Sequence, residues 1–109
     1  MEYLAASLST LKQKKKLKVQ IKNRTILLAI TETGVYAIQD KCPHMGSSLF
    51  SGIFKDGVIT CKDHGLGISV ITGEVVDKQK AEFLKLDEFS LSVRKFKTVV
   101  KEGSVFIDM

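Results

Sequence analysis

The sequence has few of the residues that cross-link or restrict a chain: its 109 residues include two cysteines, two histidines and one proline. Two cysteines can form no more than one disulfide. No run of about eighteen apolar residues occurs, so we expect no membrane span. The first four positions do not form a basic region followed by an apolar segment, which predicts no signal peptide and a cytoplasmic location.

Acidic residues are absent from one stretch, residues 12–24, where every charged side chain is lysine or arginine. The whole chain has a net charge of +5 and a composition, 44% hydrophobic and 27% charged, that is typical of one globular domain, here residues 1–109. We interpret the basic stretch as a solvated hairpin, with a docking patch for an acidic partner as the alternative. Nucleic acid is not expected as a partner, because the stretch lacks the interleaved aromatic side chains on which bases stack.

Both cysteines and both histidines lie in two short motifs, C-P-H over residues 42–44 and C-K-D-H over residues 61–64. Thiolate and imidazole are the ligands that zinc prefers, and also those of a [2Fe–2S] cluster in which two histidines replace two cysteines on one iron. The sequence therefore predicts a metal centre whose ligands are Cys42, His44, Cys61 and His64.

The spacing of these ligands favours the cluster over zinc. Zinc fingers usually pair cysteine with cysteine and histidine with histidine, whereas each motif here carries one of each. A two-iron cluster suits the mixed arrangement, because each motif gives a thiolate to one iron and an imidazole to the other. A zinc-stabilised structural domain stays open as an alternative. A disulfide between Cys42 and Cys61 is the third possibility, but it leaves both histidines unexplained.

Outside the motifs, the pattern of apolar residues and turn residues predicts short strands. Many short strands with turns between them are typical of an all-β sandwich or barrel. One segment, residues 81–86, could instead form one or two helical turns. The predicted strands cover residues 17–21, 25–30, 35–38, 58–60, 67–70, 91–100 and 105–107.

The chain resembles the Rieske-type ferredoxins, which are small soluble [2Fe–2S] proteins, and the small subunit of assimilatory NAD(P)H-nitrite reductase. The ligand motifs carry this resemblance, together with the Thr72-Gly73-Glu74 turn that follows them and the closing strand pair over residues 93–107. The resemblance implies a Rieske-type fold of antiparallel β-sheets, a sandwich or barrel, with a small cluster-binding subdomain at about residues 40–76.

The resemblance also implies a function. Cys42 and Cys61 would hold the buried iron of one [2Fe–2S] cluster per chain, and His44 and His64 the outer iron near solvent. The chain would be a one-electron carrier with no small-molecule substrate of its own. Its partners would be redox proteins, a reductase and a terminal oxidoreductase. The alternative is an electron-transfer subunit of a nitrite reductase or a ring-hydroxylating oxygenase, which leaves open whether the chain belongs to an enzyme.

Three departures from the family pattern shape our expectations. High-potential members have an extra cysteine pair, which this chain lacks. They also have two hydrogen-bonding side chains after the second histidine, where this chain has Leu66 and Ile68. Both differences predict a reduction potential in the lower part of the Rieske range. The only proline is Pro43, so another segment, residues 77–89, would have to cover the cluster. We expect a partner to dock on Met45, Leu49, Lys62 and Leu66.

Overall fold

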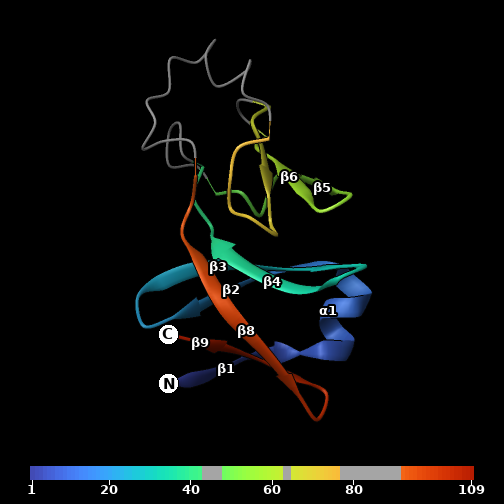
Figure 1. Ribbon diagram of the computed structural model, residues 1–109, viewed down its shortest axis with the longest axis vertical. Helices are drawn as coiled ribbons and strands as arrows, with labels where there is room; N and C mark the ends of the chain where they lie inside the picture. The colour runs from blue at the N-terminus through green and yellow to red at the C-terminus, as the bar shows by residue number, and fades with distance from the viewer. Residues whose placement is uncertain (43–47, 63–64, 77–91) are drawn as a thin grey trace.

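The computed structural model describes residues 1–42, 48–62, 65–76 and 92–109 (Figure 1). Within these ranges the chain forms one short helix and nine strands, and all strand pairs are antiparallel. In chain order the elements are β1 (Glu2–Ser7), α1 (Leu8–Lys14), β2 (Lys16–Ile21), β3 (Arg24–Thr31), β4 (Gly34–Gln39), β5 (Ile53–Lys55), β6 (Val58–Thr60), β7 (Gly67–Ser69), β8 (Lys95–Lys101) and β9 (Ser104–Asp108).

Six of the strands form one sheet in the order β1-β9-β8-β4-β3-β2. Its two edge strands also contact each other, and the ammonium group of Lys22 lies 5.0 Å from the centre of the Tyr3 ring. The sheet therefore curls into a nearly closed barrel, which protects strand edges that would otherwise be exposed to other chains. Figure 1 shows this barrel with α1 packed at one side and both termini at the same end.

The remaining three strands form a smaller sheet in the order β5-β6-β7, which lies beyond the end of β4 in Figure 1. Two-residue turns join the β2–β3, β5–β6 and β8–β9 hairpins, and both residues of each turn have positive φ. Such turns match the right-handed twist of paired strands and favour asparagine and glycine, as in Lys22-Asn23 and Asp56-Gly57.

Strand β3 separates two hydrophobic cores. Its residues Ile26 and Leu28 belong to the core of the barrel, which also contains Phe96 and Ile107. The alternate residues Leu27 and Ala29 belong to a second core, under the small sheet. Successive side chains of a strand point to opposite faces, so the continuous apolar run at residues 26–30 of β3 can serve both cores.

The all-β prediction is confirmed, and the strands expected at 17–21, 25–30, 35–38, 58–60 and 105–107 are present with their ends shifted by no more than one residue. The sequence did not predict β1, α1 or β5. Ser7 caps the start of α1, because its hydroxyl accepts a bond from the Thr10 N–H, and Lys15, which has a φ of 73°, caps the end. The predicted helical turns at 81–86 lie outside the described residues.

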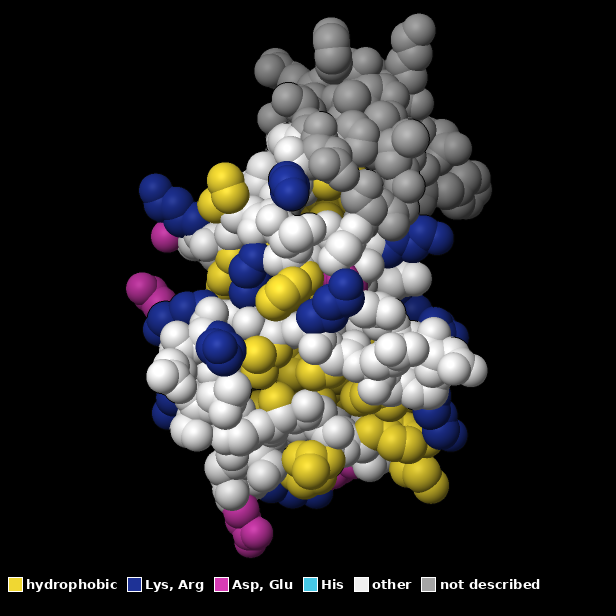
Figure 2. All heavy atoms as spheres, turned by 180° about the vertical axis from the view of Figure 1, so that it is seen from behind, with side chains coloured by type: hydrophobic (Ala, Val, Ile, Leu, Met, Phe, Trp, Pro, Cys, Tyr) yellow, Lys and Arg dark blue, Asp and Glu magenta, His cyan; other side chains and the backbone are white. Residues whose placement is uncertain are grey.

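The interpretation of residues 12–24 as a solvated hairpin is correct only for the second half of the stretch. Residues up to Lys14 belong to α1, and Lys16 is partly buried, with its ammonium bound to the carbonyls of Phe50 and Gly52. Figure 2 shows lysine and arginine side chains distributed over one face of the molecule, including the level where barrel and small sheet meet. Among the described residues, no helix has the length and apolar character required to cross a bilayer.

Candidate metal centre

Cys42 lies three residues beyond the end of β4 and is completely buried. It belongs to the second core, together with Leu27 from β3 and Leu49. The strand β4, which is buried at Ala37 and Ile38, therefore leads from the barrel to this thiol in the second core. A buried cysteine in an apolar setting is by itself an ordinary core residue, so its role depends on what lies opposite.

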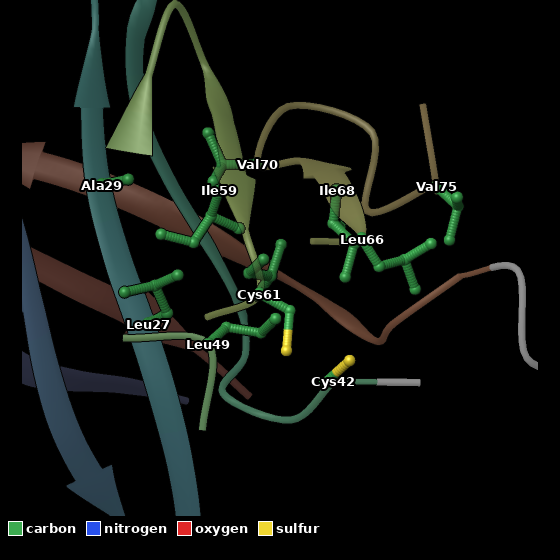
Figure 3. Packing of buried hydrophobic residues seen from close by; sticks show 11 residues of the cluster. Leu27, Ala29, Cys42, Leu49, Ile59, Cys61, Leu66, Ile68, Val70 and Val75 are labelled. Atoms are coloured by element: carbon green, nitrogen blue, oxygen red, sulfur yellow. The ribbon is translucent and has the colours of Figure 1, made fainter. Parts of the chain in front are cut away.

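Cys61 lies opposite Cys42. It directly follows β6, is 1% exposed, and belongs to the same core. Its N–H donates to the Leu66 carbonyl at 2.8 Å, and its carbonyl accepts from the Gly65 N–H at 2.8 Å. These two bonds fix the ends of the stretch that carries the second motif. In Figure 3 the sulfur atoms of Cys42 and Cys61 point towards the same space, below Leu66.

The described part of the predicted ligand set fits an iron–sulfur centre. Two buried thiols from separate stretches of chain converge on one space, and thiolates are the usual ligands of such clusters. The other two predicted ligands, His44 and His64, lie outside the described residues. Within the described ranges, no group of three or more His, Cys, Asp or Glu side chains is placed to hold a metal ion, so no separate zinc site is seen there.

The docking surface expected from the sequence is wrong for two of its residues. Leu49 and Leu66 are both 0% exposed and pack around the cysteines, so neither can contact a partner. Lys62 is exposed, as expected, whereas Met45 and the covering segment 77–89 lie outside the described residues. Motif-adjacent leucines are better explained as the apolar wall of the centre, which controls solvent access.

A buried carboxylate, Asp40, stands two residues before Cys42. Its side chain is 0% exposed; it accepts a 2.6 Å bond from the Ser48 hydroxyl and a 2.7 Å bond from the Phe50 N–H. Lys18, on β2, has its ammonium nitrogen 3.7 Å from the same carboxylate. Buried charges require such partners. One unused signal could have identified Asp40, which is an acidic residue just after a predicted strand.

A second polar group, the ammonium of Lys16 on β2, binds residues 50–52. It binds backbone carbonyls there, whereas Asp40 binds a backbone N–H. It donates to the Phe50 carbonyl and, at 2.7 Å, to the Gly52 carbonyl, and it lies 4.8 Å from the centre of the Phe50 ring. Desolvation lowers the pKa of Lys16 from its ordinary value of 10.5, while the nearby charge of Asp40 acts in the opposite direction.

Gly52 lets residues 48–52 approach the chain that leads into the second motif. A Cβ atom on Gly52 would lie 2.0 Å from the carbonyl oxygen of Thr60, the residue before Cys61. The Gly52 N–H also donates to the Leu49 carbonyl at 2.9 Å, which closes a tight turn. Residues 48–52 therefore connect the first motif to the second, a role that sequence reasoning did not detect.

Comparisons with known proteins are consistent with this geometry. A family model described as "Rieske [2Fe-2S] domain" matches residues 1–96. Among curated proteins, Apoptosis-inducing factor 3 of Homo sapiens is 29% identical over 82 residues, which are 75% of this chain and 12% of that protein. The chain thus corresponds to a small part of the curated relative that it matches.

Two solved structures show the same fold. The ferredoxin of carbazole 1,9a-dioxygenase from Nocardioides aromaticivorans IC177 superposes with a TM-score of 0.80 at 22% identity, covering 98% of this chain and 96% of that one. A chain in a complex described as reduced oxygenase and oxidised ferredoxin in carbazole 1,9a-dioxygenase gives a TM-score of 0.79 at 22% identity, covering 97% and 91%.

Proposed function

Because this chain belongs to the Rieske [2Fe–2S] domain family, we propose that it is a one-electron carrier. Family membership implies one [2Fe–2S] cluster per chain. The observation that carries the proposal is the pair of buried cysteines, Cys42 and Cys61, whose sulfur atoms point towards one space from separate stretches of chain.

The proposal assigns the ligands as the motifs suggest. Cys42 and Cys61 bind one iron, and His44 and His64 bind the other. Residues 40–76 form the cluster-binding subdomain of a single domain, supported by the second core, which collects side chains from β6 and β7 around both cysteines. When bound, the cluster accepts and releases one electron, more readily than a cluster with four cysteine ligands, because imidazole is neutral.

The partners in this proposal are redox proteins. The support is the likeness to ferredoxins of a dioxygenase system, one of them in a complex with its oxygenase. Electron-transfer complexes tend to have small interfaces, so a weak, transient association is expected. A cytoplasmic location is part of the proposal, since thiolate ligands are preserved in a reducing compartment.

A second candidate function is a permanent electron-transfer component of a larger reductase or oxygenase. The observation that favours it is the match to only 12% of Apoptosis-inducing factor 3, where the similar stretch is part of a longer protein. The two functions are distinguished by purification of the native protein. A carrier elutes alone, whereas a component elutes with a larger chain in fixed stoichiometry.

The purified protein is expected to be red-brown and to contain two irons and two acid-labile sulfides per chain, the content of one [2Fe–2S] cluster. Iron and sulfide assays on protein from iron-replete cells measure this directly. The control is the same protein after treatment with a chelator under reducing conditions, which should be colourless. Stoichiometric zinc in the native protein would contradict the proposal.

Introducing a hydroxyl at position 66 is expected to raise the reduction potential, which in the wild type should lie in the lower part of a range of about −150 to +300 mV. Leu66 is buried beside both cysteines and its side chain donates no hydrogen bond. A donor near the cluster stabilises the reduced, more negative state. The measurement is a redox titration of the Leu66→Ser protein.

The matched control for this experiment is Leu66→Ala. Both substitutions remove most of a buried side chain, at a cost of about 2–5 kcal/mol in the free energy of unfolding. Only serine adds a donor. The difference in potential between the serine and alanine variants therefore isolates the hydroxyl, and equal potentials would show that backbone amides dominate.

A further inference from the structure

The buried carboxylate of Asp40 and the ammonium of Lys16 bind one residue from opposite sides. Asp40 accepts from the Phe50 N–H at 2.7 Å, and Lys16 donates to the Phe50 carbonyl. Each makes one further bond nearby, Asp40 with the Ser48 hydroxyl and Lys16 with the Gly52 carbonyl. All four bonds end within residues 48–52.

Residues 48–52 have a defined place relative to both motifs. Asp40 precedes Cys42 by two residues, so its bond to Ser48 joins the two ends of the stretch that carries the first motif. Leu49 lies in the same buried core as Cys42 and Cys61. Gly52 packs against the backbone of Thr60, the residue before Cys61. Any displacement of residues 48–52 would therefore change how the two cysteines face each other.

We propose that Asp40 and Lys16 form one polar clamp that positions Cys42 relative to Cys61 and so sets the geometry in which the cluster is held. This inference rests on the proposed [2Fe–2S] function. Asp40 and Lys16 act through residues 48–52 and are positioning residues. The clamp is anchored in the barrel, because Lys16 belongs to β2 and the Asp40 N–H donates to the Thr25 carbonyl of β3 at 3.0 Å.

The competing explanation is that Asp40 and Lys16 contribute only to general stability and do not position the cysteines. Lys18 distinguishes these two explanations. Lys18 also pairs with Asp40, at 3.7 Å, but its side chain is 47% exposed, and no bond from it to residues 48–52 is seen in the described part of the chain. Because the Lys18 ammonium is about half exposed to solvent, its attraction to Asp40 is screened more than that of a fully buried pair would be. A clamp requires Lys16 and not Lys18, whereas simple charge compensation of Asp40 would require both lysines.

The experiment measures the rate at which a chelator removes iron from Asp40→Ala, Asp40→Asn, Lys16→Met, Lys18→Met and the Asp40→Ala/Lys16→Met double variant. The electron paramagnetic resonance spectrum of each reduced protein is recorded in parallel. Loss of an outer contact to a metal centre typically costs about 10- to 100-fold in metal affinity. We therefore expect Asp40→Ala and Lys16→Met each to release iron about 10-fold faster or more and to give broadened spectra.

The two remaining single variants are expected to resemble the wild type. In Asp40→Asn the amide oxygen can accept from the Phe50 N–H, and the Ser48 hydroxyl can turn to accept from the amide nitrogen. Lys18→Met leaves residues 48–52 bound as before. In the double variant, the increase in release rate should fall well short of the product of the single effects, because both residues hold the same segment.

The possible failures are distinguishable. Wild-type protein that holds no iron overturns the proposed function and the clamp with it. Wild-type protein with full iron, but with Asp40→Ala and Lys16→Met at the wild-type rate, overturns the clamp alone. So does an Asp40→Asn protein as impaired as Asp40→Ala, or a double variant whose effect equals the product of the single effects. If Asp40→Ala does not fold, Lys16→Met against Lys18→Met decides the question.

Discussion

The Gly52→Ala protein is expected to be purified without its cluster and with a less stable fold. The added Cβ would lie 2.0 Å from the Thr60 carbonyl oxygen, 3.0 Å from the Thr60 carbonyl carbon and 3.2 Å from the Leu49 oxygen. All three are backbone atoms, so no side-chain rotation relieves the overlap. Overpacking typically costs about 1–3 kcal/mol, and a backbone clash of this size should reach the upper end. Iron content and urea unfolding of the apo protein measure the two effects.

Gly103→Ala is the matched control for this experiment. Gly103 lies in the β8–β9 turn with a φ of +77°, and no atom lies within 4 Å of where its Cβ would be. Alanine there has a conformational cost of about 1–2 kcal/mol but no steric one, and the position is remote in sequence from both motifs. We expect full iron content. A Gly52→Ala protein with wild-type iron and stability would show that Thr60 can move without disturbing Cys61.

The Cys42→Ser protein is expected to lose the cluster completely, with disappearance of its visible absorption and of bound iron. Cys42 is fully buried and faces Cys61, so no other described side chain can take its place. The unfolding midpoint should also fall relative to the holo wild type, because the free energy of metal binding contributes to folding. Absorption spectroscopy, iron analysis and thermal unfolding measure these losses.

Two controls separate ligation from local disturbance. Cys61→Ser should give the same result as Cys42→Ser, since a cluster held by both thiolates cannot survive the loss of either. Lys62→Ala alters an exposed neighbour within the second motif and should retain the cluster. An unchanged absorption spectrum in Cys42→Ser would refute the ligand assignment.

The sequence was informative where a local pattern has a direct physical meaning. Strand β3 was predicted because an apolar run bounded by turn residues suits a strand buried on both faces. The Lys55-Asp56-Gly57 turn was predicted because glycine readily adopts positive φ. The motifs at 42–44 and 61–64 predicted the cluster, because few centres use cysteine and histidine in mixed pairs.

The features that the sequence did not reveal depend on contacts distant along the chain. Strand β1 is a short edge strand whose pairing with β9 joins residues at opposite ends of the sequence. Leu49 and Leu66 were expected at the surface because they lie near the motifs, yet both are fully buried in the second core. The importance of Gly52 comes from a backbone contact with Thr60, which no local pattern encodes.

Because β3 is buried on both faces, the stability of the barrel is coupled to the stability of the metal centre. Ile26 and Leu28 face one core while Leu27 and Ala29 face the other, so a single strand is a wall of both. Unfolding of the barrel would remove the β3 side chains that share a core with the cysteines. Unfolding of the small sheet would expose apolar side chains of β3 to water. The molecule should therefore unfold as one cooperative unit, in which iron bound at one end slows the opening of hydrogen bonds at the other.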